Sequence, residues 1–335
     1  MPRPTIRDVA KKLNLSITTV SRALDGYDDV AESTRQLVID AARKLGYTPN
    51  RAARQLRRQK AETIGFILPA GAQHFAEPFF TEFIAGLGNE LASRNYDLLV
   101  SAVASENDER EMYKRWTNGG KVDGFILNRL RLKDWRVKFL TKQHLPFATL
   151  DYSGEGRYPC IRVDGADGFV ELLEHIHKNG FRKFAFIGGP ENLVNQTERL
   201  EWFRQAMQFH GIVLDEKLIT TADLTSAGGF QSAIELLSLP DPPDTIVCVN
   251  DETAFGVLHA AHRQGLEIGR QLAVAGFDGV QDAKHSEPPL TTLDIPVFDI
   301  ARQLVDMLLK TIAGETVISP VMIKPNLLIR PSTGG

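Results

Sequence analysis

The chain has 335 residues, of which 43% are apolar, and a formal net charge of −3. These values are typical of a soluble globular protein that is too long for a single hydrophobic core. Its two cysteines, Cys160 and Cys248, lie far apart and form no CxxC pair, so neither a zinc finger nor a disulfide framework is supported. The N-terminus has no apolar leader segment and no stretch has the apolar length to span a bilayer. We therefore expect a cytoplasmic protein without a membrane partner.

The charges are distributed unevenly along the chain. Residues 1–60 contain thirteen Lys or Arg and six Asp or Glu, whereas the rest of the chain contains 26 basic and 36 acidic side chains. This asymmetry predicts a small basic domain that neutralises phosphates and a larger acidic domain that does not.

The run from Thr5 to Leu24 predicts a helix, a tight turn and a second helix. Apolar side chains recur at the i, i+3, i+4 and i+7 positions that form one buried face of the first helix. They are Ile6, Val9, Ala10 and Leu13. Thr5 is the expected N-cap, and Asp8 stands where a capping box places its acidic partner. Ser16 is expected to cap the second helix.

The second helix has the composition of a helix that presents its N-terminal residues to DNA bases. Its core-facing residues are expected to be Val20, Ala23 and Leu24, and its outward residues Ile17, Thr18, Ser21 and Arg22. An ordinary helical hairpin is the alternative interpretation of this segment. The excess of basic residues favours DNA binding over that alternative.

A third helix is expected over residues 33–45, followed by Gly46 as its stop. Its predicted inner stripe consists of Leu37, Val38, Ala41, Ala42 and Leu45. Asn50 can then cap a short helix, RAARQLRRQ, in which Leu56 is the only large apolar residue. Such a helix is marginal in isolation, so we expect it to order when a partner chain and DNA are present. A charged linker is the alternative.

The elements TVSRAL and LGYTPNRAARQL resemble the DNA-binding head and hinge helix of the LacI/GalR family of bacterial transcriptional regulators. The resemblance implies base contacts by Ile17, Thr18 and Arg22, phosphate contacts by Thr5, Ser16, Thr19, Ser21 and Asn50, and minor-groove contacts by Ala53 and Leu56. Arg22 can pair with guanine through two hydrogen bonds, and a Leu56 from each subunit would enter a central base step and kink the duplex. Ala31 departs from the family pattern, which has a serine cap there.

From about Ala61 onward, short apolar runs alternate with helical stretches. The expected strands are TIGFIL, YDLLVSAV, VDGFIL, FATLD, KFAFIGG, IVCVND and LAVAGFD. This alternation predicts an α/β fold of doubly wound parallel sheets buried on both faces. The resemblance extends over this body and implies a fold like that of periplasmic sugar-binding proteins, with two subdomains joined by three crossing strands.

The expected domain division therefore has three parts: a helix-turn-helix head at 1–49, a hinge at 50–60, and an effector-binding and dimerisation body at 61–335. Within the body, the first subdomain is expected at about 62–160 plus 293–320, and the second at about 163–290 plus 322–331. The segment PPLTTLDIP, residues 288–296, resembles a crossing strand of the family.

Polar side chains stand at several strand ends, where ligands bind in folds of this kind. Taken singly, each is more simply a helix cap, a turn residue or a surface charge. Together they match the positions to which the resemblance assigns effector binding: Asp151, Arg199, Asn250 and Asp278, with Phe79 and Phe80 as aromatic contacts. Core packing is the alternative for both phenylalanines. Charge-assisted bonds to hydroxyl groups suit a sugar, although Trp202 and Leu224 depart from the family pattern near this site.

The sequence contains no GxSxG, HExxH, Walker or GxGxxG motif, so we predict no enzyme activity, cofactor or metal. His259 and His262 lie at i, i+3, where a solvated helix face is the simpler interpretation. The predicted function is an allosteric transcriptional repressor whose homodimer binds a near-palindromic DNA operator under the control of a small molecule. A sugar is the expected effector. The alternatives are a non-sugar effector such as a purine, or a sugar-binding protein without DNA function.

Overall fold

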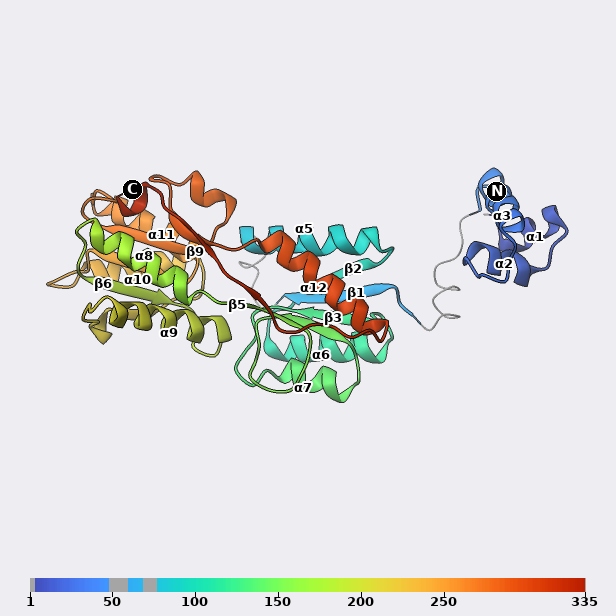
Figure 1. Ribbon diagram of the computed structural model, residues 1–335, viewed down its shortest axis with the longest axis horizontal. Helices are drawn as coiled ribbons and strands as arrows, with labels where there is room; N and C mark the ends of the chain where they lie inside the picture. Colours follow the sequence, from blue (N-terminus) through green and yellow to red (C-terminus); the bar gives the residue numbers. More distant parts are fainter. Residues whose placement is uncertain (1–3, 48–59, 69–76, 335) are drawn as a thin grey trace. The chain divides into compact units, whose positions relative to one another are not determined.

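The computed structural model describes residues 4–47, 60–68 and 77–334. It divides into two compact units, Met1–Ala61 and Glu62–Gly335, which we call the head and the body (Figure 1). Within the described residues, no helix combines the length and the apolar character that crossing a membrane requires.

The head consists of three short helices, α1 (Ile6–Leu13), α2 (Ile17–Leu24) and α3 (Glu32–Leu45). The Asp8 carboxylate accepts hydrogen bonds from the backbone N–H and the hydroxyl of Thr5, each at 2.8 Å. The Ser16 hydroxyl accepts the N–H of Thr19 at 2.9 Å. Both predicted caps are confirmed, and they satisfy backbone donors that helix starts otherwise leave unpaired.

The core of the head is formed by Val9, Val20 and Val38, all fully buried, together with small side chains around them. The prediction that Leu37 belongs to this core is wrong, because its side chain is 53% exposed. Val38 and Ala41 occupy the inward face of α3. Leu37 lies about 100° around the helix from Val38, so its side chain points away from that face.

The first half of the body is built on a six-stranded sheet in the order β11-β5-β4-β3-β1-β2. Every neighbouring pair in it is parallel. Its strands are β1 (Thr63–Leu68), β2 (Asp97–Ala102), β3 (Gly124–Leu127), β4 (Phe147–Leu150), β5 (Cys160–Val163) and β11 (Val321–Ile323). Its helices are α5 (Pro78–Ser93), α6 (Glu106–Asn118), α7 (Trp135–Lys142) and α12 (Val297–Ile312).

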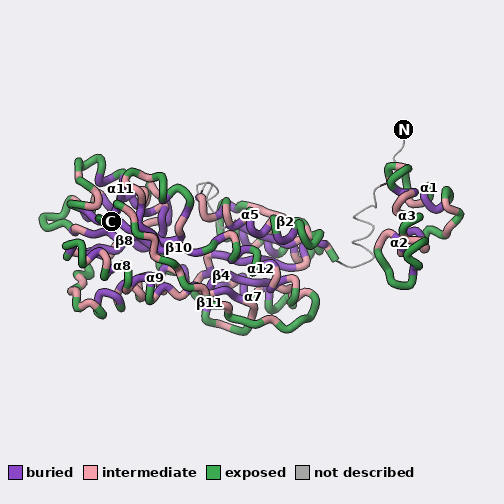
Figure 2. Tube along the Cα trace, turned by 45° about the horizontal axis from the view of Figure 1, so that its top comes forward, coloured by how far each residue is buried: buried purple, intermediate pink, exposed green. Residues whose placement is uncertain are grey.

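Side chains along β1 alternate between the two helical layers that cover this sheet. Ile64 and Phe66 pack in a cluster with residues of α5 and α12, whereas Ile67 packs in a cluster with residues of α6 and α7. Burial on both faces explains why the strand is apolar throughout, and Figure 2 shows the buried residues concentrated in the strands and on the inner helix faces.

The second half of the body repeats the arrangement, with strand order β12-β10-β9-β8-β6-β7. Its strands are β6 (Phe184–Gly188), β7 (Ile219–Thr221), β8 (Thr245–Cys248), β9 (Ala273–Asp278), β10 (Thr291–Asp294) and β12 (Asn326–Leu328). Its helices are α8 (Ala166–Lys178), α9 (Val194–Phe209), α10 (Ser226–Leu237) and α11 (Asp251–Arg263). Only the edge strand β12 runs antiparallel to its neighbour among the described pairs of this sheet.

The chain passes between the two sheets three times, after β5, after β10 and between β11 and β12. The expected α/β architecture with two doubly wound sheets is confirmed, and all seven expected strands are present. The two strand orders correspond position by position, so that β3 is equivalent to β8 and β4 to β9. The polar side chains that lie between the two sheets therefore come from equivalent strand ends.

Candidate functional site

A cavity lies between the two sheets, lined by residues that follow strands of both halves of the body. Its polar lining residues are Glu77, Asn128, Arg129, Asp151, Asn195, Arg199, Asn250 and Asp278. The free volume is about 40 Å³, and a buried water needs about 10–15 Å³ by the same kind of measure. The cleft is therefore nearly filled by its own side chains in this conformation.

The sequence predicted five of the residues that line this cavity: Phe79, Asp151, Arg199, Asn250 and Asp278. Phe80, which the sequence also assigned to the ligand, is fully buried in the core and does not line the cavity. The two rings lie on neighbouring positions of α5, so they point in different directions. The assignment of Phe80 is accordingly corrected to core packing.

Arg199 is the most highly connected cation of the cleft. Its Nη2 lies 2.9 Å from Oδ1 of Asp278, its Nη1 donates to the carbonyl of Val249, and its guanidinium stacks on the Phe277 ring with 3.7 Å to the centroid. Burial raises the pKa of Asp278 above its ordinary value, and the Arg199 charge opposes that increase. The pair is nearly buried, with 8% and 9% of the side chains exposed.

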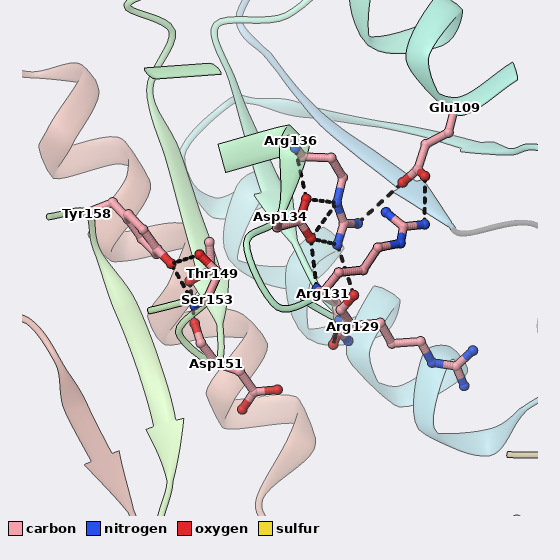
Figure 3. Close-up of polar contacts among 10 residues, drawn as sticks. Glu109, Arg129, Arg131, Asp134, Arg136, Thr149, Asp151, Ser153 and Tyr158 are labelled. Atoms are coloured by element: carbon pink, nitrogen blue, oxygen red, sulfur yellow. Dashed lines mark hydrogen bonds and ion pairs between the residues drawn. The ribbon is translucent and has the colours of Figure 1, made fainter. Parts of the chain in front are cut away.

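Asp151 occupies the position in the first sheet that Asp278 occupies in the second. Both backbones are in the positive-φ region, with φ of 73° and 110°, which costs free energy for non-glycine residues and is found at functional sites. Figure 3 shows the Asp151 carboxylate extending away from its neighbours Thr149, Ser153 and Tyr158. Within the described part of the chain its carboxylate has no hydrogen-bond partner, and burial raises its pKa to about 7.

This raised pKa gives a pH dependence. The ordinary value is 3.8 and the folded value about 7, so between these values the native state holds a proton that the unfolded chain has lost. The contribution of Asp151 to stability is then fully present below about 3.8 and is lost as the pH rises through about 7. Asp251 and Glu252 act in the same direction, because burial raises the pKa of each, to about 8 and about 7.

We predict that Asp151→Asn flattens part of this decline. Urea unfolding of wild type and variant from pH 4 to pH 8 measures the difference in the free energy of unfolding, which isolates Asp151 from the other two acids. The variant should gain stability relative to wild type as the pH rises. A pH-independent difference between the two proteins would contradict the assignment.

Asn250 lines the cavity and is also the N-cap of α11. Its side-chain oxygen accepts the N–H of Thr253 and caps α11, and its amide nitrogen donates to the carbonyl of Leu224 at 3.1 Å. Since both polar atoms are engaged, Asn250 is held rigidly at the cavity wall.

Four polar residues that line the cavity were not predicted from the sequence: Glu77, Asn128, Arg129 and Asn195. Asn128 follows β3 directly, and its Nδ2 is a buried donor without a partner among the described residues. Arg129 forms an ion pair with Glu77 at 2.5 Å and stacks over the Phe80 ring. The rule that polar residues at strand ends face the ligand, applied to the strand VDGFIL, would have found Asn128 and Arg129.

The loop after β3 also connects the two halves of the body across the cleft. Arg131 and Leu193 form an antiparallel bridge, and the N–H of Leu132 donates to the carbonyl of Asn192 at 2.9 Å. We call this loop, residues 128–134, the strap. Its backbone bonds hold the halves together beside the cavity.

The strap rests on a buried ion network shown in Figure 3. Arg136 pairs with Asp134 at 2.6 Å and with Glu109 at 3.4 Å, and Arg131 pairs with Glu109 at 2.9 Å. Arg136 also donates to the carbonyl of Arg129 at 2.9 Å. Burial lowers the pKa of Arg136 but the Asp134 carboxylate raises it, and the net shift is upward.

In the head, Ile17 is 46% exposed and Thr18 and Arg22 are accessible from solvent. The prediction that Ser21 faces outward is wrong, since it is 3% exposed and its hydroxyl donates to Asp25 at 3.3 Å. Ser21 lies next to the core residue Val20 and shares the inward side of α2. The predicted residues Asn50, Ala53 and Leu56 lie outside the described residues.

No group of three or more His, Cys, Asp or Glu that could hold a metal ion occurs within residues 4–47, 60–68 and 77–334.

Comparison with known proteins assigns both units. The profile "Bacterial regulatory proteins, lacI family" matches residues 5–50, and "Periplasmic binding protein-like domain" matches residues 173–333. The transcriptional repressor CytR of Escherichia coli K12 is 31% identical over 332 residues, which cover 98% of this chain and 96% of CytR.

Two solved structures are similar over nearly the whole chain. The first is a complex of the transcriptional regulator CelR with cellobiose, with 28% identity, a TM-score of 0.75 and coverage of 98% of this chain and 100% of CelR. The second is the lac repressor dimer bound to operator and the anti-inducer ONPF, with 25% identity, a TM-score of 0.84 and 99% coverage of both chains.

Proposed function

The chain belongs to the LacI family of bacterial regulatory proteins and is a DNA-binding transcriptional regulator, and from this premise we propose that a sugar bound in the cleft controls its binding to operator DNA. The head supplies sequence recognition and the body senses the sugar. In this role the chain acts in the cytoplasm, where it represses transcription and catalyses no reaction.

One observation carries the assignment of the cleft. The Asp151 carboxylate and the Asn128 amide nitrogen are nearly buried groups that have no partner in the described chain and lie at the cavity wall. A buried polar group without a partner costs free energy, and hydroxyl groups of a sugar can pair with an acceptor and a donor together. The cellobiose in the CelR complex supports a sugar over a purine.

The closed cleft must widen to admit such a ligand. Pockets for small molecules usually measure about 300–1,000 Å³, against the 40 Å³ of this conformation. Opening the cleft separates the strap from residues 192–194, and closure around the sugar restores these contacts. Ligand occupancy thereby biases the relative position of the two halves.

For the head, we propose base contacts by Ile17, Thr18 and Arg22 and phosphate contacts by Thr5, Ser16 and Thr19. The lac repressor neighbour binds its operator as a dimer, and a homodimer of this chain would place two α2 helices on the half-sites of a near-palindrome. We also propose that the hinge, through Asn50, Ala53 and Leu56, transmits closure of the cleft to the heads.

A thermal-shift screen of mono- and disaccharides, with cellobiose and free nucleosides included, tests the sugar assignment. A sugar present at 100 times its Kd should stabilise the body by about 2.7 kcal/mol, and Asp151→Asn should reduce or abolish that shift. The matched control is Asp167→Asn, an exposed aspartate on α8 that pairs with Lys324. A shift produced only by nucleosides would overturn the sugar assignment and leave the regulator function in place.

A further inference from the structure

The loop that follows α2 is bound tightly to the end of that helix. Gly26 has a φ of +76°, its N–H donates to the carbonyl of Ala23, and the N–H of Tyr27 donates to the carbonyl of Arg22 at 3.1 Å. This pair of bonds is the Schellman motif that ends many helices. The backbone of Tyr27 is therefore held against the last turn of α2.

The far end of the same loop is held by α3 and by the core. Val30 is buried, and its N–H donates to the carbonyl of Tyr27 at 3.2 Å. Arg35 of α3 donates to the same carbonyl at 2.9 Å. With both ends restrained, the loop presents the side chains of Tyr27 and Asp29 at a defined place beside α2.

Both of these side chains contact the guanidinium of Arg22. Its Nε lies 3.1 Å from Oδ1 of Asp29, and its Nη2 lies 2.5 Å from Oδ2. The Tyr27 ring lies against its face, with 4.7 Å from Cζ to the ring centroid. Asp29 thus uses one edge of the guanidinium, the edge of Nε and Nη2, while Nη1 has no hydrogen-bond partner among the described residues.

A guanidinium has five N–H groups in a fixed plane, so engaging one edge leaves another free. Guanine presents O6 and N7 side by side in the major groove and accepts two parallel hydrogen bonds from arginine. The Nη1 and Nη2 edge of Arg22 still offers two donors in that arrangement. Asp29 and Tyr27 restrain the arginine without consuming this edge.

We propose that Asp29 is a positioning residue for base recognition, which acts through Arg22 by holding its guanidinium with the Nη1 and Nη2 edge directed outward to a guanine. This inference rests on the proposed role of Arg22 as a base contact. The competing role for Asp29 is a decoy that occupies Arg22 and must be displaced by DNA. The two roles predict opposite effects when the carboxylate is removed.

The experiment uses the full chain and a duplex selected by the wild-type protein from a randomised library. At each guanine of that duplex, 7-deazaguanine replaces guanine and removes N7 alone. The measured quantity is the ratio of Kd for the substituted duplex to Kd for the selected duplex. Where Arg22 contacts a guanine N7, the substitution weakens binding of the wild-type protein and the ratio exceeds one. Arg22→Ala should lower the ratio at that guanine by about 5- to 150-fold, towards one, which identifies the contacted guanine.

At that guanine, Asp29→Ala is expected to lower the ratio by about 2- to 10-fold, because the arginine must now be immobilised on binding. Asp29→Asn keeps one acceptor oxygen and should fall between wild type and Asp29→Ala. Asp28→Ala is the matched control: it removes the same charge from the same loop, at an exposed residue that forms no ion pair within the described residues. It should leave the ratio unchanged.

Removing either acidic side chain should also raise affinity for bulk DNA similarly, since each lessens repulsion of phosphates. An increased ratio for Asp29→Ala would establish the decoy role and overturn the proposal. A ratio equal to that of wild type, or to that of Asp28→Ala, would overturn it as well. If Arg22→Ala changes no ratio, the proposed base contact itself fails. Circular dichroism of each variant verifies that the head remains folded.

Discussion

Replacing Arg136 by alanine is expected to lower the free energy of unfolding of the body by about 3–5 kcal/mol. The side chains of Arg136, Asp134 and Glu109 are each 1% exposed or less. Without the guanidinium, the Asp134 carboxylate is left buried with backbone donors alone, and an uncompensated buried charge is much more costly than a lost surface pair. Urea unfolding followed by circular dichroism measures the loss.

The matched control is Lys114→Ala, which removes a cation paired with Glu111 at 2.9 Å on the exposed face of α6. Such pairs contribute about 0–1 kcal/mol. The double variant Asp134→Asn/Arg136→Met removes both charges and should recover part of the loss, because Glu109 keeps its ion pair with Arg131. An Arg136→Ala variant that loses no more stability than Lys114→Ala would show that the network contributes little.

The network also explains why the strap beside the cleft could not be predicted from the sequence. Glu109 pairs with cations more than twenty residues away, and no local pattern indicates which acid on a polar helix will be buried. The bonds from the strap to residues 192–194 likewise join segments whose proximity depends on the complete fold. The contacts that hold the strap in place are therefore not encoded in the periodicity of the sequence.

Patterns with a fixed geometry were more informative. Apolar runs predicted the strands, and the polar residues that close these runs predicted Asp151, Asn250 and Asp278 at the cavity. The errors occurred on helices, where one residue shifts the direction of a side chain by about 100°. Ser21 and Phe80 were assigned to the wrong side for this reason.

The second large effect is expected from Arg199→Ala, which should abolish the response of operator binding to the sugar. Arg199 joins α9 to the end of β9 through Asp278 and to the end of β8 through the carbonyl of Val249. Its removal takes a charge-assisted donor from the cavity wall and loosens three elements that meet there. Operator binding without sugar should persist, because the head contains its own core.

The same substitution should destabilise the body by about 3–5 kcal/mol, since it leaves Asp278 buried without its cation. Arg199 opposes the burial that raises the pKa of Asp278, so the variant's carboxyl should have a still higher pKa. The native variant then binds a proton that its unfolded chain releases near the ordinary value of 3.8. Below the folded pKa of wild-type Asp278 both native proteins hold this proton, and above it only the variant does. The stability of the variant relative to wild type should therefore decrease as the pH rises through the folded pKa of wild-type Asp278.

Arg204→Ala is the matched control for both readouts, because Arg204 lies on the same helix and pairs with Glu216 at 2.7 Å in an exposed position. Removing it should cost less than about 1 kcal/mol and leave the sugar response intact. Binding of a selected operator duplex is measured with and without the sugar for each variant. If Arg199→Ala responded to the sugar as Arg204→Ala does, the cleft around Arg199 would not be the effector site, because its central cation would be dispensable for the ligand.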